Sequence, residues 1–198
     1  IYSLVEQLKN KNNTVQWIHK SKYISEGDLV FCLGCGQILS SEILSRNSHN
    51  LVVHESALPK GKGWSPLTWQ ILEGKHEIPI TLFEAAETID SGRIYIKDSL
   101  MFNGDELIDE LRKAQAEKSI EMCLQFVEKY PQILNLAQEQ YGESTYYPRR
   151  TPKDSRLDPD KTIREQFNLL RVVDNERYPA FFEINGNIYT IKIEKTIK

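Results

Sequence analysis

A histidine at position 54 and an aspartate at position 90 are residue types suited to acid–base or acyl-transfer chemistry. His54 follows the short apolar run 51–53, whose composition is typical of a strand buried on both faces. A loop rich in proline and glycine comes next, and open α/β sheets hold their ligands where such strands end. Spacing alone leaves a structural alternative open. A lone histidine is more often structural, and an aspartate before Ser91-Gly92 more often forms a turn.

The composition is that of a globular protein, with 40% hydrophobic and 27% charged residues in a chain of 198. This length accommodates one domain of ordinary size with a small appendage. The net charge of −3 argues against a general affinity for nucleic acid or for anionic membranes. No apolar run approaches the length of a membrane span. We therefore expect neither nucleic acid nor a membrane as a partner.

The three cysteines are too few and too scattered for a disulfide scaffold, which is typical of a reducing compartment. We therefore expect a cytoplasmic protein. Cys32 and Cys35 form a C-x-x-C pair, which could indicate redox chemistry or half of a zinc site. Cys32 lies inside an apolar run and no second pair follows, so the pattern favours buried packing, and we expect no metal site.

The hydrophobic pattern predicts helices and strands in alternation along most of the chain. The expected helices are residues 1–11, 38–45, 65–74 and 105–129. The expected strands are residues 14–18, 28–35, 51–53, 78–84 and 94–101. This alternation predicts an α/β domain with a parallel sheet and right-handed crossovers. Such a domain normally begins with a strand, whereas this chain begins with a helix, so we expect a first strand upstream of Ile1.

The composition changes at residue 141 and divides the chain into 1–140 and 141–198. A polar loop, a short helix over 163–173 and two strands joined by Asn185-Gly186 are expected in the second part. A tail of about 50 residues is small for an independent domain. We expect it to pack on the main domain as a small α+β appendage and to form one wall of a cleft.

Several motifs occur in a fixed order over residues 28–100. They are Gly34-Cys35-Gly36-Gln37-Ile38-Leu39, His54-x-Ser56-x-Leu58-Pro59, Lys62-Gly63-x-x-Pro66 and Ile89-Asp90-x-Gly92. This set resembles the N10-formyltetrahydrofolate-dependent formyltransferase family. The resemblance implies a Rossmann-like formyltransferase domain with a mostly parallel sheet. It also implies an enzyme that transfers a formyl group, with N10-formyltetrahydrofolate as cosubstrate and no metal.

The resemblance assigns roles to residues of these motifs. His54 and Asp90 are the expected catalytic residues, with His54 donating to the developing oxyanion or relaying a proton and Asp90 holding the histidine or accepting a proton. The pterin of the folate is expected between two segments, because main-chain groups suit its donor–acceptor edge. The expected cofactor-binding residues are Gly34, Cys35, Gly36, Gln37, Ile38, Ala86, Glu87 and Ile89.

The tail narrows the resemblance to the sugar-nucleotide N-formyltransferases, through Arg149-Arg150-Thr151-Pro152-x-Asp154, Asn168-Leu169-x-Arg171 and Tyr178-Pro179-Ala180-Phe181. The branch acting on UDP-linked 4-amino-4,6-dideoxy sugars in pseudaminic acid-type biosynthesis is the most similar. The expected substrate-binding residues are Lys60, Lys62, Tyr147, Arg149, Arg150, Arg171, Asn175, Tyr178 and Phe181. By analogy with this branch we also expect a homodimer.

One position departs from the family pattern. The family's catalytic asparagine falls two residues before the histidine, where this chain has Val52. Asn50 lies on the same strand face but about 13 Å from His54 along an extended strand, unless a bulge shortens the distance.

Other functions remain open from the sequence. Formyl transfer to aminoacyl-tRNA requires a basic RNA-binding appendage, against which the net charge and short tail argue. Transfer to glycinamide ribonucleotide, or hydrolysis of formyltetrahydrofolate, leaves the tail unexplained. A folate- or nucleotide-binding module without catalysis is the alternative that Val52 supports.

Overall fold

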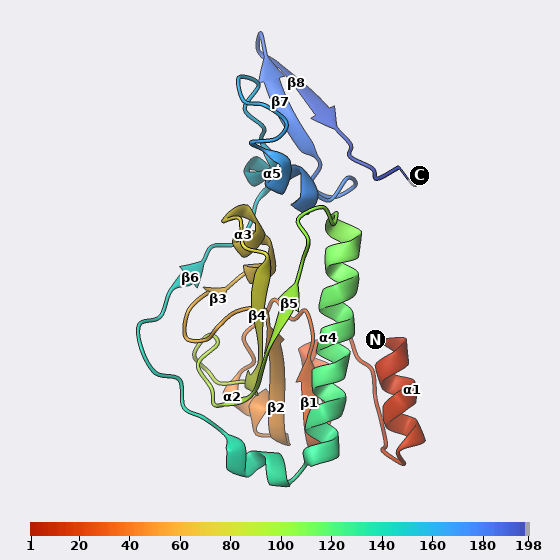
Figure 1. The fold of residues 1–198 in the computed structure, drawn as a ribbon. Helices are drawn as coiled ribbons and strands as arrows, with labels where there is room; N and C mark the ends of the chain where they lie inside the picture. Colours follow the sequence, from red (N-terminus) through yellow and green to blue (C-terminus); the bar gives the residue numbers. More distant parts are fainter. Residues whose placement is uncertain (197–198) are drawn as a thin grey trace.

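The computed structural model describes residues 1–196, and a four-stranded sheet lies at its centre (Figure 1). The strand order is β1-β2-β4-β5, with the strands at Gly27–Cys32, Asn47–His54, Glu77–Glu84 and Ile94–Met101. β1 and β2 are parallel, whereas β4 is antiparallel to both β2 and β5. The predicted α/β class is confirmed, but the expectation of a mostly parallel sheet is wrong.

The connections explain the direction of the strands. Helix α2 (Ser41–Leu44) lies in the crossover between the parallel strands β1 and β2. Helix α3 (Pro66–Leu72) has seven residues and spans roughly 10 Å, too little to return the chain along the eight residues of β2. β4 therefore starts at the end where β2 finishes and runs the opposite way. A short loop then connects β4 to β5, which also requires an antiparallel pair.

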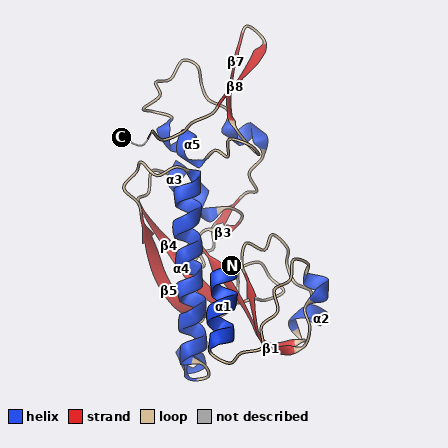
Figure 2. Cartoon of the chain, turned by 90° about the vertical axis from the view of Figure 1, so that its right-hand side faces the viewer, coloured by secondary structure: helices blue, strands red, loops and turns tan. Residues whose placement is uncertain are grey.

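Two helices cover one face of the sheet. Helix α4 (Ile108–Lys129) crosses this face, and helix α1 (Tyr2–Asn10) packs beside α4 (Figure 2). The main core lies between them and the strands, and its most buried side chains include Leu51, Ile71, Ile78, Ile80, Leu82, Leu111, Met122, Cys123 and Phe126. Within residues 1–196, none of the helices combines the length and apolar character needed to cross a membrane.

The strand expected over 14–18 is wrong. These residues form no regular element, and the ring of Trp17 packs edge-on against Tyr2, with 4.7 Å between the ring centroids. The residues have strand-like composition, yet β1 pairs only with β2 in the described chain, so the segment gains no ladder of hydrogen bonds there.

The tail crosses the molecule before it folds into a small unit (Figure 1). After a 3₁₀ turn at Gln132–Leu136, it passes β5 and forms β6 (Tyr146–Tyr147), which pairs in parallel with β3 (Lys62–Gly63). Beyond a 3₁₀ turn at Pro152–Ser155 lie helix α5 (Phe167–Val172) and the hairpin β7–β8 (Ala180–Ile184 and Asn187–Ile191). A separate small core contains Leu157, Leu170, Val173 and Ala180. The hairpin predicted around Asn185-Gly186 is confirmed, and the helix starts later than residue 163.

Candidate functional site

His54 is the last residue of β2, and its side chain is buried where the strand ends. Its Nε2 lies 2.9 Å from the carbonyl oxygen of Gly61. A carbonyl oxygen can only accept a hydrogen bond, so Nε2 carries the hydrogen in this arrangement. The ring is thereby fixed in one orientation.

Asp90 approaches the same ring nitrogen from the loop between β4 and β5. Its Oδ2 lies 3.6 Å from His54 Nε2 and accepts a hydrogen bond of 2.8 Å from the backbone N–H of Gly63. The side chains of both residues are largely shielded from solvent, at 9% and 14% exposed. The structure thus brings together the two residues that the sequence singled out, although 36 positions separate them. A carboxylate beside an imidazole can stabilise its protonated form or accept a proton.

The glycines of the loop after β2 allow this approach. Gly61 and Gly63 have φ angles of 73° and 101°, which glycine adopts readily. A Cβ on Gly63 would lie 2.4 Å from the carbonyl oxygen of Tyr147 in β6. Only glycine therefore lets β3 pair with β6 while its N–H points at Asp90.

The loop that carries Asp90 is held at both ends and at its turn. The N–H of Glu84 donates to the carbonyl of Arg93, which closes the loop. A Cβ on Gly92 would lie 1.8 Å from the Glu84 carbonyl oxygen, so glycine is required. The side-chain amide of Gln140 donates to the carbonyls of Asp90 and Gly92, both at 2.9 Å. Sequence reasoning missed Gln140, because no local pattern joins it to a loop 50 residues earlier.

Glu55 is a second residue that sequence reasoning missed. It follows His54, but its side chain lies towards α4, where Gln115 Nε2 donates to Oε1 at 2.8 Å. Gln70 also donates to the Glu55 carbonyl, at 2.6 Å. Glu55 is 7% exposed, and this burial raises the pKa of its carboxyl group, partly opposed by the charge that His54 can carry. The residue after the candidate catalytic histidine is thus a buried acid, close enough for the charge of the histidine to affect its pKa.

The model of the family described as formyl transferase matches residues 4–127, more than half of the chain. This chain belongs to the formyl transferase family. The matched region contains β1, β2, β4, β5 and all but the last two residues of α4, and it includes both His54 and Asp90. The part of the molecule that holds the candidate site is thus a formyl transferase domain.

Individual relatives extend this result. A methionyl-tRNA formyltransferase of Thermodesulfovibrio yellowstonii is 26% identical over 167 residues, covering 84% of this chain and 53% of that protein. The chain spans about half the length of the curated relatives it matches. A solved methionyl-tRNA formyltransferase from Clostridium thermocellum has a TM-score of 0.70 at 25% identity, covering 84% of this chain and 72% of that one.

The fold of the tail is shared as well. A 4-N formyltransferase from Francisella tularensis has a TM-score of 0.67, covering 98% of this chain and 84% of that chain. At 23% identity this likeness shows the fold alone.

Within the formyl transferase pattern, Val52 occupies the position where an asparagine was expected. The pairing of β2 with β4 runs in unbroken register from Leu51 to His54, so no bulge brings Asn50 closer. The Asn50 amide instead donates to the Leu44 carbonyl at 2.9 Å, while its buried Oδ1 has no hydrogen-bond partner in residues 1–196. Val52 packs against apolar residues on the His54 face of the strand, such as Leu58. The amide is therefore missing from this site.

The expected pterin-binding residues lie in two loops that flank this strand. The first of these is the exposed loop after β1, at the end of the sheet where His54 lies. It contains Gly34, Cys35, Gly36, Gln37 and Ile38. The loop after β4 contains Ala86, Glu87 and Ile89. This loop starts beside Asn50, because the Ala85 N–H donates to the Asn50 carbonyl. Cys32 is buried with Ile24 and Leu39, so the predicted packing role is confirmed for this cysteine, whereas it is wrong for Cys35, which is exposed.

Among the expected substrate-binding residues, Lys62 has the most unusual surroundings. Only 7% of it is exposed, yet its ammonium group forms no ion pair with any carboxylate of the described chain. Lys60 is exposed in the same loop. Tyr147 stacks on Trp69 at 6.4 Å between ring centroids, and its hydroxyl donates to Glu73 at 2.8 Å.

Three of the expected substrate-binding residues are engaged inside the protein instead. Arg171 is 1% exposed and donates to the backbone carbonyl and the carboxylate of Glu106, both at 3.0 Å. Arg150 donates to the carbonyls of Val172 and Asp154, and Asn175 exchanges hydrogen bonds with the backbone of Ile193. These side chains stabilise the tail and are not free for a diphosphate. The remaining expected residues are Arg149 and Tyr178, which are exposed, and Phe181, which is half-buried.

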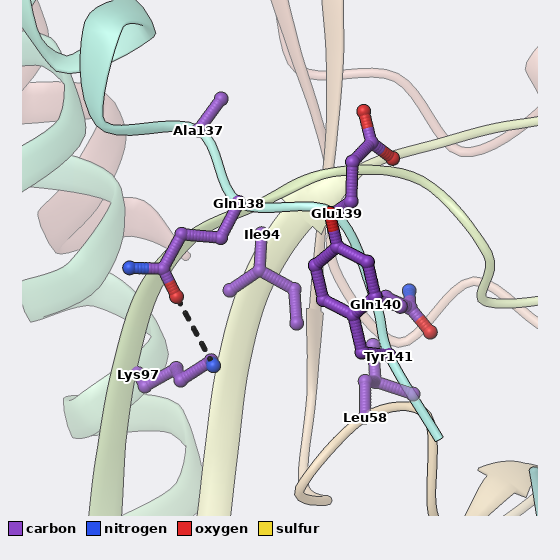
Figure 3. A pocket seen from close by; sticks show the side chains of 8 residues that line it. All are labelled: Leu58, Ile94, Lys97, Ala137, Gln138, Glu139, Gln140 and Tyr141. Atoms are coloured by element: carbon purple, nitrogen blue, oxygen red, sulfur yellow. Dashed lines mark hydrogen bonds between the residues drawn. The ribbon is translucent and has the colours of Figure 1, made fainter. Parts of the chain in front are cut away.

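A cavity of about 460 Å³ lies beside the Asp90 loop, lined by Leu58, Ile94, Lys97 and residues 137–141 (Figure 3). Within residues 1–196, no group of three or more His, Cys, Asp or Glu side chains could hold a metal ion.

Proposed function

We propose that this protein transfers a formyl group from N10-formyltetrahydrofolate to the amino group of a nucleotide-linked sugar. The observation that carries the proposal is the buried pair of His54 and Asp90, 3.6 Å apart, in a formyl transferase domain. The preferred substrate is a UDP-linked 4-amino-4,6-dideoxy sugar.

The folate supplies the formyl group, and the residues of this chain orient and assist the transfer. The sugar amine attacks as the free base, a C–N bond forms, and the bond between the formyl carbon and the folate nitrogen breaks. The Nε2–H of His54, which donates to the Gly61 carbonyl in the free protein, donates during transfer to the oxyanion that develops on the formyl oxygen. Asp90 stabilises the charge on the imidazole and accepts the proton that the amine loses, which returns to the folate nitrogen.

The loop after β1 fits a pterin. Cys35, Gly36 and Gln37 are exposed residues, and their backbone N–H groups have no hydrogen-bond partner in the described chain. Unused main-chain donors beside an apolar strand suit the donor–acceptor edge of a pterin ring. Val52 supplies the apolar surface between this loop and the Asp90 loop.

The surroundings of Lys62 support the proposal that the substrate is an anion. Lys62 is 7% exposed and its ammonium group has no carboxylate partner in the described chain, so a bound anion could take the place of that partner. A sugar nucleotide carries a diphosphate, and the exposed Lys60 and Arg149 could add to its binding. The Trp69–Tyr147 stack provides an aromatic wall close to Lys62, because Tyr147 belongs to the strand that pairs with β3.

Formyl transfer to methionyl-tRNA is the second candidate, because the curated relatives carry that name. The net charge of −3 gives the chain no general attraction for a polyanion of that size. The test is an assay of the purified protein with N10-formyltetrahydrofolate and either UDP-4-amino sugars or methionyl-tRNA. We expect formylated sugar nucleotide only. Formylated tRNA without formylated sugar would replace our proposal with the second candidate.

We also propose that two copies associate through the β7–β8 hairpin. It projects from the rest of the molecule (Figure 1) and exposes the side chains of Ile184, Ile188 and Tyr189. A two-stranded hairpin is marginally stable by itself and gains stability when an apolar face is covered.

A further inference from the structure

Gln140 holds the turn that carries Asp90 by a pair of hydrogen bonds. Its Nε2 lies 2.9 Å from the carbonyl oxygens of both Asp90 and Gly92. Carbonyls only accept, and a side-chain amide nitrogen has two hydrogens, so one NH₂ group satisfies both. Gln140 comes from the crossing segment of the tail, beside Leu58 and Tyr141 (Figure 3).

The Asp90 backbone needs such a support. Its φ angle is 47°, in the left-handed region, which is strained for a residue with a Cβ. From this backbone conformation the carboxylate reaches both the Gly63 N–H and the neighbourhood of His54. If the two carbonyls lost their donor, the turn could relax towards a less strained conformation and carry the carboxylate away from the histidine.

The crossing segment is itself fixed on both sides of the site. Gln138 exchanges two backbone hydrogen bonds of 2.8 Å with Ile94, next to the Asp90 loop. Further along, the Thr145 carbonyl accepts from the Lys62 N–H, and the Tyr147 carbonyl accepts from the Trp64 N–H. One segment therefore holds the turn that presents Asp90 and also the strand that supplies its N–H donor.

We propose that Gln140 is a positioning residue for formyl transfer, acting through Asp90. It does not touch the reacting groups. Its amide fixes the left-handed turn so that the Asp90 carboxylate faces His54 and the Gly63 N–H. This inference rests on the proposed function, because it takes Asp90 as the catalytic carboxylate.

The test compares Gln140→Leu with Gln138→Leu as the matched control. Gln138 lies two residues away, and its exposed side chain accepts a hydrogen bond of 3.3 Å from Lys97. We expect Gln140→Leu to lower kcat by about 10-fold or more, with the KM for the sugar nucleotide within about twofold. Gln138→Leu should leave kcat within about twofold. Equal effects of the two substitutions would overturn the inference.

A double-mutant cycle separates positioning from a general structural role. If Gln140 acts through Asp90, adding Gln140→Leu to Asp90→Asn should change the residual kcat by less than about twofold. The same loss in both backgrounds would show that Gln140 acts independently of Asp90. If Asp90→Asn alone kept the wild-type rate, the catalytic assignment in the proposed function would fail instead.

Gln140→Glu provides a second variant in case the leucine variant does not fold. An ionised glutamate cannot donate to the two carbonyls, whereas a protonated one can donate to one of them. At pH 8, where a glutamate is ionised, we therefore expect kcat of this variant to be about 10-fold or more below that of wild type. A kcat within about twofold of wild type at this pH would contradict the inference.

Discussion

At the scale of single residues, the candidate site depends on groups that the interior of the protein forces into contact. His54 has a single orientation because its Nε2–H donates to the Gly61 carbonyl, and Asp90 is fixed by the Gly63 N–H. Neither contact follows from residue type. The sequence indicates a histidine at a strand end and an aspartate in a turn, and only the packed loops bring them to 3.6 Å.

Glu55 should make the stability of the protein depend on pH. Burial raises the pKa of this carboxyl group above its ordinary value of 4.5. At pH values between 4.5 and the raised pKa, Glu55 keeps its proton in the folded state but has lost it in the unfolded state. The free energy of unfolding therefore falls as pH rises through this range. Glu55→Gln removes this titration but keeps an oxygen that accepts from Gln115.

The measurement is the free energy of unfolding from urea titrations at several pH values. Relative to wild type, Glu55→Gln should gain stability as pH rises from about 4.5 to about 7. Glu143→Gln, at an exposed position, serves as the control. A constant difference between wild type and Glu55→Gln across this range would contradict the prediction.

At the scale of elements, hydrophobic periodicity was a good guide to the helices, and the Asn185-Gly186 turn was a good guide to the β7–β8 hairpin, because these patterns are local. The direction of β4 was not predictable in the same way, since it depends on how far α3 carries the chain. The segment 14–18 has strand-like composition but no partner strand in the described chain. The resemblance likewise suggested Arg171 as a ligand for the diphosphate, whereas burial against Glu106 gives it a structural contact.

The turn between β4 and β5 should not tolerate a side chain at Gly92. A Cβ there would lie 1.8 Å from the Glu84 carbonyl oxygen, so the turn must shift or β4 must move. We expect Gly92→Ala to lower the free energy of unfolding by roughly 1–3 kcal/mol, measured by urea titration. Gly36→Ala is the control, because no atom lies within 4 Å of a Cβ at that position. Equal stability of the two variants would disprove this requirement.

The rate at which a thiol reagent labels Cys35 should report folate binding to the loop after β1. Cys35 is exposed, whereas Cys32 and Cys123 are buried, with the pKa of each thiol raised to about 12 by burial. A thiol reagent at neutral pH should therefore label Cys35 alone. We expect tetrahydrofolate to slow this labelling by about 10-fold, followed by mass spectrometry. An unchanged labelling rate at saturating folate would place the pterin elsewhere.

At the scale of the whole molecule, the tail connects the candidate site to the small unit that contains α5. Its crossing segment contacts the Asp90 loop through Gln140 and the β3 loop through β6. No periodicity in the sequence predicted these contacts, because they join residues far apart in the chain. The site therefore depends on both parts of the chain, although the family match ends at residue 127.

The proposed dimer is tested by sedimentation equilibrium. We expect wild type to sediment as a dimer and Ile188→Glu, which places a charge on the exposed hairpin, to sediment as a monomer. Ile163→Glu is the control, because Ile163 is similarly exposed but lies outside the hairpin. A wild-type protein that is monomeric at micromolar concentration would remove this proposal and leave the site unaffected.

The most direct test of the central claim measures the transfer of labelled formyl groups from N10-formyltetrahydrofolate to a UDP-4-amino sugar by wild type and His54→Asn. Wild type should produce formylated sugar nucleotide with multiple turnovers. His54→Asn should lower kcat by about 10²–10³-fold, because an oxyanion donor is removed or displaced. Wild-type turnover by His54→Asn, or no formylated sugar from the wild-type protein, would contradict the claim.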